Sequence, residues 1–367
     1  MKVALNAMFL DPGASGGPET YLRELARALP AAVPELELEI LTTRRGAAAL
    51  RADGFAGVVA LPADESQRLR RLAAELVLAP RVARRRGADV LHSLASIGPV
   101  WTPGVAHVVT IHDVTFFRMR TFGTVTTVAM KQLMTRAARN ADALIAPAAD
   151  GADDMAPALG VPREKVTVVP HGAGRVSDVE PAPEDAVRDH YALGRRRVVL
   201  CVASKRPHKN QELLVRAAAG LPDDVVVVLA GHPEPYDAIL RELAAELGVT
   251  DRVVFADYVP DAELETLWRI AACAAFPTLA EGFGIPVVEA LGRGVPIACS
   301  DIAVLHEVGG DVPHYFDPRD PAAAVAAIEA AIGDDDARST GPSRAAGFSW
   351  EAAARATYAV YEQAVAA

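Results

Sequence analysis

The sequence predicts an α/β protein of two doubly wound domains that face each other across a cleft, and three observations support this fold class. The chain has 367 residues, and a prior of about 150 residues per domain indicates two domains. Short β-branched runs alternate with longer amphipathic runs, which is the pattern of a parallel sheet with crossover helices. The alternation stops at 175–191, a proline- and acid-rich stretch typical of a linker, and then restarts.

The first domain is expected to comprise residues 1–174. Its strands are predicted from short apolar runs at 3–9, 38–43, 90–93, 107–112, 143–146 and 166–169. Its helices are predicted from amphipathic runs at 18–29, 66–86, 126–139 and 150–159. A last helix at 350–366, after a Gly- and Asp-rich loop, could pack back on this domain.

The second domain is expected to comprise residues 175–349. Its predicted strands are 198–203, 225–230, 253–258, 274–276 and 296–299. Its predicted helices are 211–219, 237–247, 263–271 and 287–293. In such sheets ligands bind outside the carboxyl ends of the strands, so functional residues are sought there.

Composition excludes several classes of function. The net charge of −10 argues against nucleic-acid binding, which needs a basic surface to neutralise phosphates. Cys201, Cys273 and Cys299 lie in apolar runs without zinc spacing, so we expect buried thiols in a reducing compartment. The start "MKVALNAMFLDPG" lacks a cleavage site, and no run approaches the ~20 apolar residues of a spanning helix. We therefore expect a cytoplasmic protein, with any membrane contact peripheral.

Two carboxylates interrupt the apolar stretch "FPTLAEGFGIPVVEALGRGVPIACSD" at Glu281 and Glu289. A buried carboxylate must be paired, hydrogen-bonded or protonated, because isolated burial of the charge costs several kcal/mol. Glu289 could form an ion pair with Arg293 four residues on, and Glu281 could be a solvated loop acid. The alternative is that both bind a ligand.

A glycine turn between the two acids leads into a helix. Pro286 is tolerated only in the first turn of a helix. The backbone N–H groups of Phe283, Gly284 and Ile285 are then donors at a positive helix end, suited to phosphate or sugar oxygens. Gly282 and Gly284 allow a ligand to approach the backbone.

The segment "ASKRPHKN" follows the first predicted strand of the second domain. It crowds Lys205, Arg206 and Lys209 into one loop before a helix, for which Asn210 is the expected N-cap. Three cations beside a helix N-terminus make an anion site. The alternative is a solvated basic loop.

The first domain carries weaker signals. Gly13, Gly16 and Gly17 follow the first strand in "DPGASGGPETYL" and could accept a phosphate, but the spacing is not that of a dinucleotide site. His92, His112 and His171 come at strand ends and would together line one edge of a cleft, although a lone strand-end histidine is more often structural. His112, followed by Asp113, is the best candidate for contacting a reacting group.

Together, "EGFGIPVVEA", "ASKRPHKN", "TIHD", "VVPHG" and "GGPETY" resemble the retaining glycosyltransferases of glycosyltransferase family four, in its mannosyltransferase-like group. The order and spacing match from the first strand to about residue 318. The resemblance implies the GT-B fold, with two Rossmann-like domains. It makes the first an acceptor-side domain and the second the nucleotide-sugar-binding domain.

The resemblance also implies roles for the candidate residues. Lys209 would bind the donor diphosphate, and Glu289 the nucleotide ribose. Glu281 would hold sugar hydroxyls, and His112 would touch the transferred sugar near its anomeric carbon. The other donor-binding residues would be Gly16, Gly17, Ser204, Lys205, Arg206, His171, Gly282, Phe283, Gly284 and Ile285.

Three departures from the family pattern affect these roles. Many relatives carry Gly-Arg where this chain has Ala203 and Ser204, so Lys205 or Arg206 must supply any second phosphate cation. The stretch "APAAD" removes a serine after the strand predicted at 143–146, and Arg293 replaces a small residue. No metal is expected: the pair Asp334–Asp336 lies in a polar segment after the second domain.

The implied reaction is transfer of a hexosyl group from a nucleotide sugar to an acceptor hydroxyl with retention at the anomeric carbon. GDP-mannose is the first candidate donor, followed by UDP-hexoses, and the acceptor is unknown. The alternatives are an epimerase or hydrolase of sugar nucleotides, a non-catalytic nucleotide-sugar-binding partner, and an NAD-dependent oxidoreductase, which the poor glycine fingerprint disfavours.

The segment 66–87 holds seven arginines and one glutamate in an acidic protein. Its apolar positions Leu69, Leu72, Leu76 and Val77 have helical spacing. This suits an anionic bilayer surface or a lipid-linked acceptor. The alternative is a core-facing helix with a solvated basic face.

Overall fold

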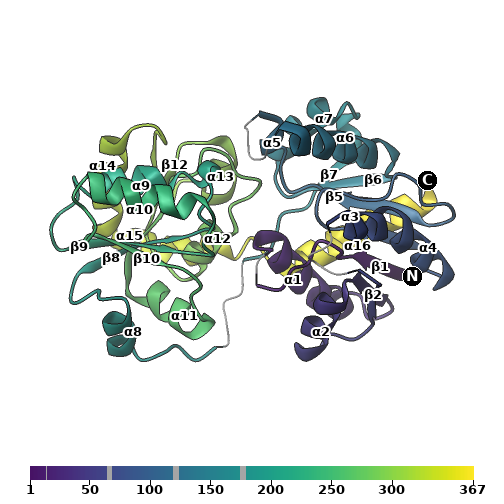
Figure 1. The fold of residues 1–367 in the computed structure, drawn as a ribbon, viewed down its shortest axis with the longest axis horizontal. Helices are drawn as coiled ribbons and strands as arrows, with labels where there is room; N and C mark the ends of the chain where they lie inside the picture. The colour runs from purple at the N-terminus through teal and green to yellow at the C-terminus, as the bar shows by residue number, and fades with distance from the viewer. Residues whose placement is uncertain (14, 64–67, 119–123, 174–178) are drawn as a thin grey trace. The chain divides into compact units, whose positions relative to one another are not determined.

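The computed structural model describes residues 1–13, 15–63, 68–118, 124–173 and 179–367. The chain forms two compact units, one of Met1–Gly172 with Ser349–Ala367 and the other of Ala173–Phe348 (Figure 1). The chain therefore passes between the units twice, after Gly172 and after Phe348.

The first unit is built on a parallel sheet of seven strands in the order β3-β2-β1-β4-β5-β6-β7. Most strands are buried runs of Val, Leu, Ile and Ala, as expected for a sheet covered on both faces. The strands are β1 Lys2–Asn6, β2 Glu37–Thr42, β3 Val58–Ala60, β4 Val90–Ser93, β5 Ala106–Thr110, β6 Ala143–Ala146 and β7 Val166–Val168.

Helices cover this sheet, and one comes from the far end of the chain. The C-terminal helix α16 packs on α1 (Figure 1) and buries Tyr361 and Ala354 in the same cluster as Leu22 and Leu25. Ser349 caps α16 by accepting from Ala352 N at 3.1 Å. The helices are α1 Gly17–Ala32, α2 Arg44–Ala52, α5 Thr115–Arg118, α6 Thr124–Asn140, α7 Ala149–Leu159 and α16 Trp350–Ala366.

The single helix expected at 66–86 is interrupted. Residues 66 and 67 lie outside the described ranges, and the rest forms α3 Arg68–Ala73, a π-helical segment Ala74–Leu78 and α4 Ala79–Arg85. Pro80 has no N–H and its ring clashes with the carbonyl four residues back, so it breaks α-helical pairing. The Ala79 N–H instead reaches Ala74 O, five residues back.

The second unit is built on a parallel sheet in the order β10-β9-β8-β11-β12-β13. The strands are β8 Arg197–Val202, β9 Val225–Ala230, β10 Val253–Ala256, β11 Ala271–Phe276, β12 Ile297–Ser300 and β13 His314–Phe316. The helices are α8 Glu184–His190, α9 Gln211–Ala217, α10 Tyr236–Glu246, α11 Asp261–Ile270, α12 Ile285–Gly292, α13 Ala303–Gly309, α14 Pro321–Ile332 and α15 Asp335–Ala345. Two parallel α/β units confirm the predicted fold class.

Two segments expected to be irregular are helical. The linker contains α8, which begins after Pro183 with two acids in its first turn. The Gly- and Asp-rich stretch contains α15, where Asp334 accepts from Ala337 N at 2.9 Å and bonds His314 at 2.8 Å. Asp334 is therefore a helix cap.

Candidate functional site

The candidate site of the second unit lies where the strand order reverses. The strands β8 and β11 are neighbours, and their loops leave the carboxyl edge of the sheet side by side. These loops bring Lys209 and Glu281 together, with Nζ of Lys209 2.5 Å from Oε2 of Glu281. Each side chain keeps 19% of its surface exposed, so a ligand can reach the pair.

Asn210 fixes the position of Lys209. It follows the 3₁₀ turn Pro207–Lys209 and has left-handed backbone geometry, with φ of 54°. Its side chain does not cap α9, contrary to expectation. Instead Nδ2 donates to Pro277 O at 2.9 Å and to Pro318 O at 2.8 Å. This amide ties the Lys209 loop to the loop that carries Glu281.

A second tie joins the same two loops through the His208 carbonyl. This oxygen accepts from Leu279 N at 2.8 Å and from Thr278 Oγ1 at 3.1 Å. The turn before Glu281 is thus hydrogen-bonded to the turn before Lys209. Hydrogen bonds between the two loops therefore fix the backbone beside both Lys209 and Glu281.

The other two cations of the loop are engaged elsewhere. Lys205 is fully buried, donating to Gly231 O at 2.8 Å and lying 3.4 Å from Asp257. Arg206 pairs with Glu234 at 2.7 Å, and Ser204 is half-buried in the same loop. Of the three cations, Lys209 is the one that meets Glu281.

The glycine turn prepares the N-terminus of α12. Gly284 precedes the helix with φ of 97°, a geometry that side chains rarely adopt, and a Cβ there would lie 2.9 Å from Leu305 Cδ2. In the described part of the chain, no acceptor is bonded to the N–H groups of Gly284 or Ile285. Gly282 is buried, and Phe283 packs edge-on against Phe348. The helix therefore presents open donors beside Glu281.

Glu289 sits within α12 and does not pair with Arg293. The Arg293 guanidinium binds Glu265 at 2.7 Å and reaches only the backbone oxygen of Glu289. Burial raises the pKa of the Glu289 carboxyl to about 7; Arg293 opposes this rise and Glu265 adds to it. Among the described residues the carboxylate has no hydrogen-bond partner, so its charge is poorly compensated.

A narrow pocket of ≈ 20 Å³ opens at this site. It is lined by Lys209, Glu281, Gly284 and Pro286, with Leu305 and the end of β8. That volume holds about one water molecule. Lys209 and Glu281 thus both border this pocket.

In the first unit, His112 and His171 follow β5 and β7 and lie against each other. His112 Nε2 donates to Leu94 O at 2.7 Å, and its Nδ1 is 3.4 Å from Nε2 of His171. His171 stacks on Trp350, with ring centroids 5.7 Å apart, and Tyr21 lies 4.6 Å from His171. Burial lowers the pKa of both imidazoles.

His92 does not line a cleft edge, contrary to expectation. It is fully buried within β4, where it bonds the hydroxyl of Tyr361 and Oγ1 of Thr110, both at 2.7 Å. Burial lowers its pKa to about 3. It is a core histidine that ties α16 to the sheet.

The glycine loop ends in α1. Gly16 precedes the helix with φ of 60°, Gly17 is its first residue, and a Cβ at either would meet open space. Glu19 accepts from Gly13 N at 3.0 Å and binds Arg23 at 2.8 Å. The buried Glu19 therefore shapes this loop. The sequence signal for this role is an acid in the first turn of a helix.

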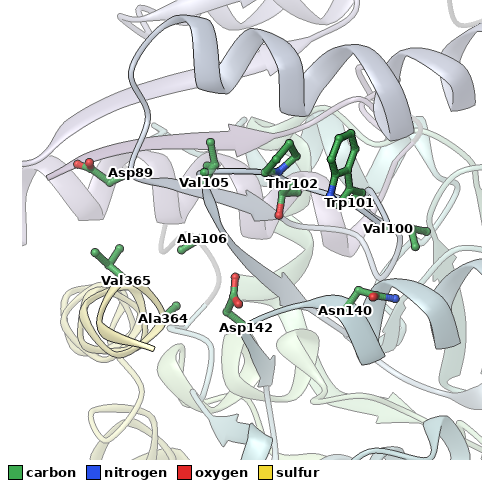
Figure 2. Close-up of a pocket in the computed structure, with 12 residues that line it drawn as sticks. Asp89, Val100, Trp101, Thr102, Val105, Ala106, Asn140, Asp142, Ala364 and Val365 are labelled. Carbon is green, nitrogen blue, oxygen red and sulfur yellow. The ribbon is translucent and has the colours of Figure 1, made fainter.

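A hollow lies at the other edge of this sheet. It measures ≈ 520 Å³ and borders the amino ends of β4, β5 and β6. Figure 2 shows Trp101 on one side and Val365 on the other. Its acids cap strands: Asp89 accepts from Lys2 N and Asp142 from His107 N, both at 2.7 Å. None of the predicted site residues lines it.

Family models match the two halves of the chain in turn. Residues 15–173 match the model described as Glycosyltransferase Family 4. Residues 184–345 match the model described as Glycosyl transferases group 1. Together the two matches leave only the ends of the chain and a short connection uncovered.

Curated relatives are transferases. The chain is 32% identical over 184 residues to O-antigen chain mannosyltransferase B of Escherichia coli, covering 48% of each chain. It is 32% identical over 246 residues to D-inositol 3-phosphate glycosyltransferase of Thermobispora bispora, covering 61% of this chain and 56% of the relative. The chain thus spans about half the length of the curated relatives it matches.

The fold also matches a solved structure over its whole length. Anabaena Alr3699/HepE in complex with UDP and glucose aligns with a TM-score of 0.77 at 19% identity, covering 99% of both chains. This likeness shows a common fold. Because the two family models follow each other along the chain and each falls on one α/β unit, the chain belongs to the family-four glycosyltransferases of the GT-B fold.

Proposed function

We propose that the chain transfers a hexosyl group from a nucleotide sugar to an acceptor hydroxyl with retention at the anomeric carbon and without a metal ion. The Lys209–Glu281 pair carries this proposal, since it sets a cation and a carboxylate 2.5 Å apart beside the open N-terminus of α12. The ammonium and the helix N–H groups suit a diphosphate, and the carboxylate suits sugar hydroxyls.

The same groups can replace a metal ion. A leaving diphosphate needs its developing charge neutralised, and fixed cations and helix dipoles can supply this. Glu289 would accept hydroxyls of the ribose, which would provide the donors that its buried carboxylate requires. Turnover should then survive an excess of EDTA.

Names of similar proteins support a mannosyl or glucosyl donor. The Escherichia coli relative is named an O-antigen chain mannosyltransferase, and the Anabaena structure contains UDP and glucose. We place GDP-mannose first and UDP-hexoses next. The acceptor is a hydroxyl compound of glycan, glycolipid or natural-product synthesis on the cytoplasmic side.

Retention is proposed to proceed by attack on the face that the leaving group departs from, with the leaving phosphate accepting the proton of the acceptor. A covalent route would need a carboxylate near the anomeric carbon. Glu281 is engaged by the Lys209 ammonium, which weakens it as a nucleophile. A glycosyl adduct trapped on Glu281 would overturn this route.

The test of the proposed function is a donor panel followed by product analysis. At 100 times its dissociation constant, the true donor should stabilise the protein by about 2.7 kcal/mol in thermal melting. Product NMR should then show the anomeric configuration of the donor. Free sugar or an isomer formed from donor alone would indicate a hydrolase or epimerase, and donor binding without turnover a non-catalytic partner.

Membrane contact through α3 and α4 is a further part of the proposal. Leu69 is 83% and Val77 48% exposed, and Arg81, Arg84 and Arg85 are exposed nearby. Exposed apolar and basic side chains along the same stretch of chain suit an anionic bilayer. No helix in the described ranges has both the length and the apolar character needed to cross a bilayer.

We expect Arg84→Ser/Arg85→Ser to weaken binding to anionic liposomes about 30-fold, since each arginine contributes ~1 kcal/mol at such a surface. Pelleting with anionic and with neutral vesicles measures this. The control Arg216→Ser/Arg355→Ser removes two exposed, ion-paired arginines of other helices and should change nothing. Equal, negligible pelleting of the parent with both vesicles would end the membrane proposal.

A further inference from the structure

Hydrogen bonds fix which nitrogen of His112 carries the proton. The Leu94 carbonyl can only accept, so at 2.7 Å from Nε2 it requires the proton there. In the neutral ring Nδ1 is then a bare lone pair. That lone pair faces Nε2 of His171 at 3.4 Å, so His171 must be the donor of this contact.

His171 is itself held by the start of α16. Its ring is nearly parallel to that of Trp350, with an interplanar angle of 18°. The next residue is glycine because Trp350 leaves no room: a Cβ on Gly172 would lie 2.5 Å from the indole. Trp350 follows the second chain crossing and Ser349, the cap of α16. The direction of the His171 N–H is thus set by the C-terminal helix.

Burial disfavours the charged form of both rings. It is the largest cause of the lowered pKa of His112 and of His171, and His112 lowers that of His171 further. Asp113 and the Leu94 carbonyl act in the opposite direction on His112. Two adjacent imidazolium ions would repel, so the arrangement requires one neutral donor and one neutral acceptor.

We propose that His171 is a positioning residue: by donating to Nδ1 while the Leu94 carbonyl holds the proton on Nε2, it fixes the His112 ring in one orientation. The consequence for turnover rests on the proposed function; the tautomer does not. Without the His171 donor, the His112 ring keeps only its hydrogen bond to the Leu94 carbonyl and can pivot about it against the transferred sugar. Misplacement of a contacting group by about 1 Å costs up to 10²-fold in rate.

The experiment combines imidazole ¹⁵N NMR with kinetics on His171→Gln and His171→Leu. Glutamine can donate an N–H to His112 Nδ1, and leucine cannot. In the parent and in His171→Gln, His112 should be the Nε2–H tautomer at pH 7, with the Nδ1 chemical shift of a nitrogen that accepts a hydrogen bond. In His171→Leu the Leu94 carbonyl still holds the proton on Nε2, but the Nδ1 shift should move to that of a nitrogen without a donor. We expect kcat to fall 10- to 100-fold in His171→Leu and to be partly restored in His171→Gln.

The parental spectrum can refute the proposal even if His171→Leu fails to fold. An Nδ1–H or protonated His112 at pH 7 would do so, and so would an Nδ1 shift typical of a nitrogen that accepts no hydrogen bond. An unchanged Nδ1 shift in a folded His171→Leu would also refute it. If no donor is turned over but the Nδ1 shift moves in His171→Leu, the positioning stands and only the proposed function is lost.

Discussion

Lys209→Ala is expected to lower kcat by about 10²- to 10³-fold, the usual loss when one preorganised group that stabilises developing charge is removed. Lys209 is the loop cation that meets Glu281, whereas Lys205 and Arg206 are committed to partners of their own. Neither can swing to the diphosphate without leaving its own partners unpaired. Steady-state kinetics with a fixed acceptor and saturating donor would measure the loss.

The control removes a cation from the same helix neighbourhood without touching the site. Arg216 lies on α9 and pairs with Glu212 on the surface, so Arg216→Ala should leave kcat within about twofold. A double-mutant cycle with Glu281→Gln should be strongly non-additive, because the two side chains are in contact. Parental turnover in Lys209→Ala would contradict the proposed role of the lysine.

Much of the fold could be predicted because the strands are continuous apolar runs. The run 225–230 is β9 without change. The strand β13 escaped prediction because it is only three residues long and includes a histidine. The sequence of α15 predicts a loop because Gly341 and Pro342 are typical of turns, although Asp334 provides an N-cap that signals a helix start.

The site was predicted in its residues but not in their contacts. Lys209 and Glu281 are predicted as site residues because each follows the carboxyl end of a strand. Nothing in a sequence, however, shows that residues so far apart form an ion pair. The sequence makes Lys205 and Lys209 equal candidates for binding an anion, and only the packing distinguishes them. Lys205 is buried and bonded to Gly231, whereas Lys209 borders the pocket. Likewise His92 and His112 look alike at strand ends until burial distinguishes them.

Glu289→Gln is expected to stabilise the protein above pH 7 and to weaken donor binding 10- to 100-fold. Burial raises the pKa of Glu289 from 4.5 to about 7. Between pH 4.5 and about 7, the folded state therefore retains a proton that the unfolded state has lost. Stability falls as pH rises from about 4.5 and stays lower above 7. The substitution should remove this loss of stability, which is about 3 kcal/mol at most. Denaturant unfolding of the parent and of Glu289→Gln at pH 4 and pH 8 measures it.

Glu75→Gln is the matched control for the stability effect. Burial also raises the pKa of Glu75 to about 7, but this residue lies in the π-helical segment of the first unit. It should reproduce the pH-dependent stabilisation and leave donor affinity unchanged. If both variants are stabilised and only Glu289→Gln loses donor affinity, the stability effect comes from burial of the carboxylate and the affinity effect from its contact with the donor.

Proton release on donor binding tests directly whether Glu289 binds the ribose. If ribose hydroxyls bind the ionised Glu289, the donor must expel a proton below pH 7, so affinity should rise from pH 6 to pH 8. Calorimetry in two buffers of different ionisation enthalpy should detect the released proton in the parent and in Glu75→Gln, but not in Glu289→Gln. Equal release from all three proteins would mean that another group titrates, and that Glu289 does not hold the nucleotide.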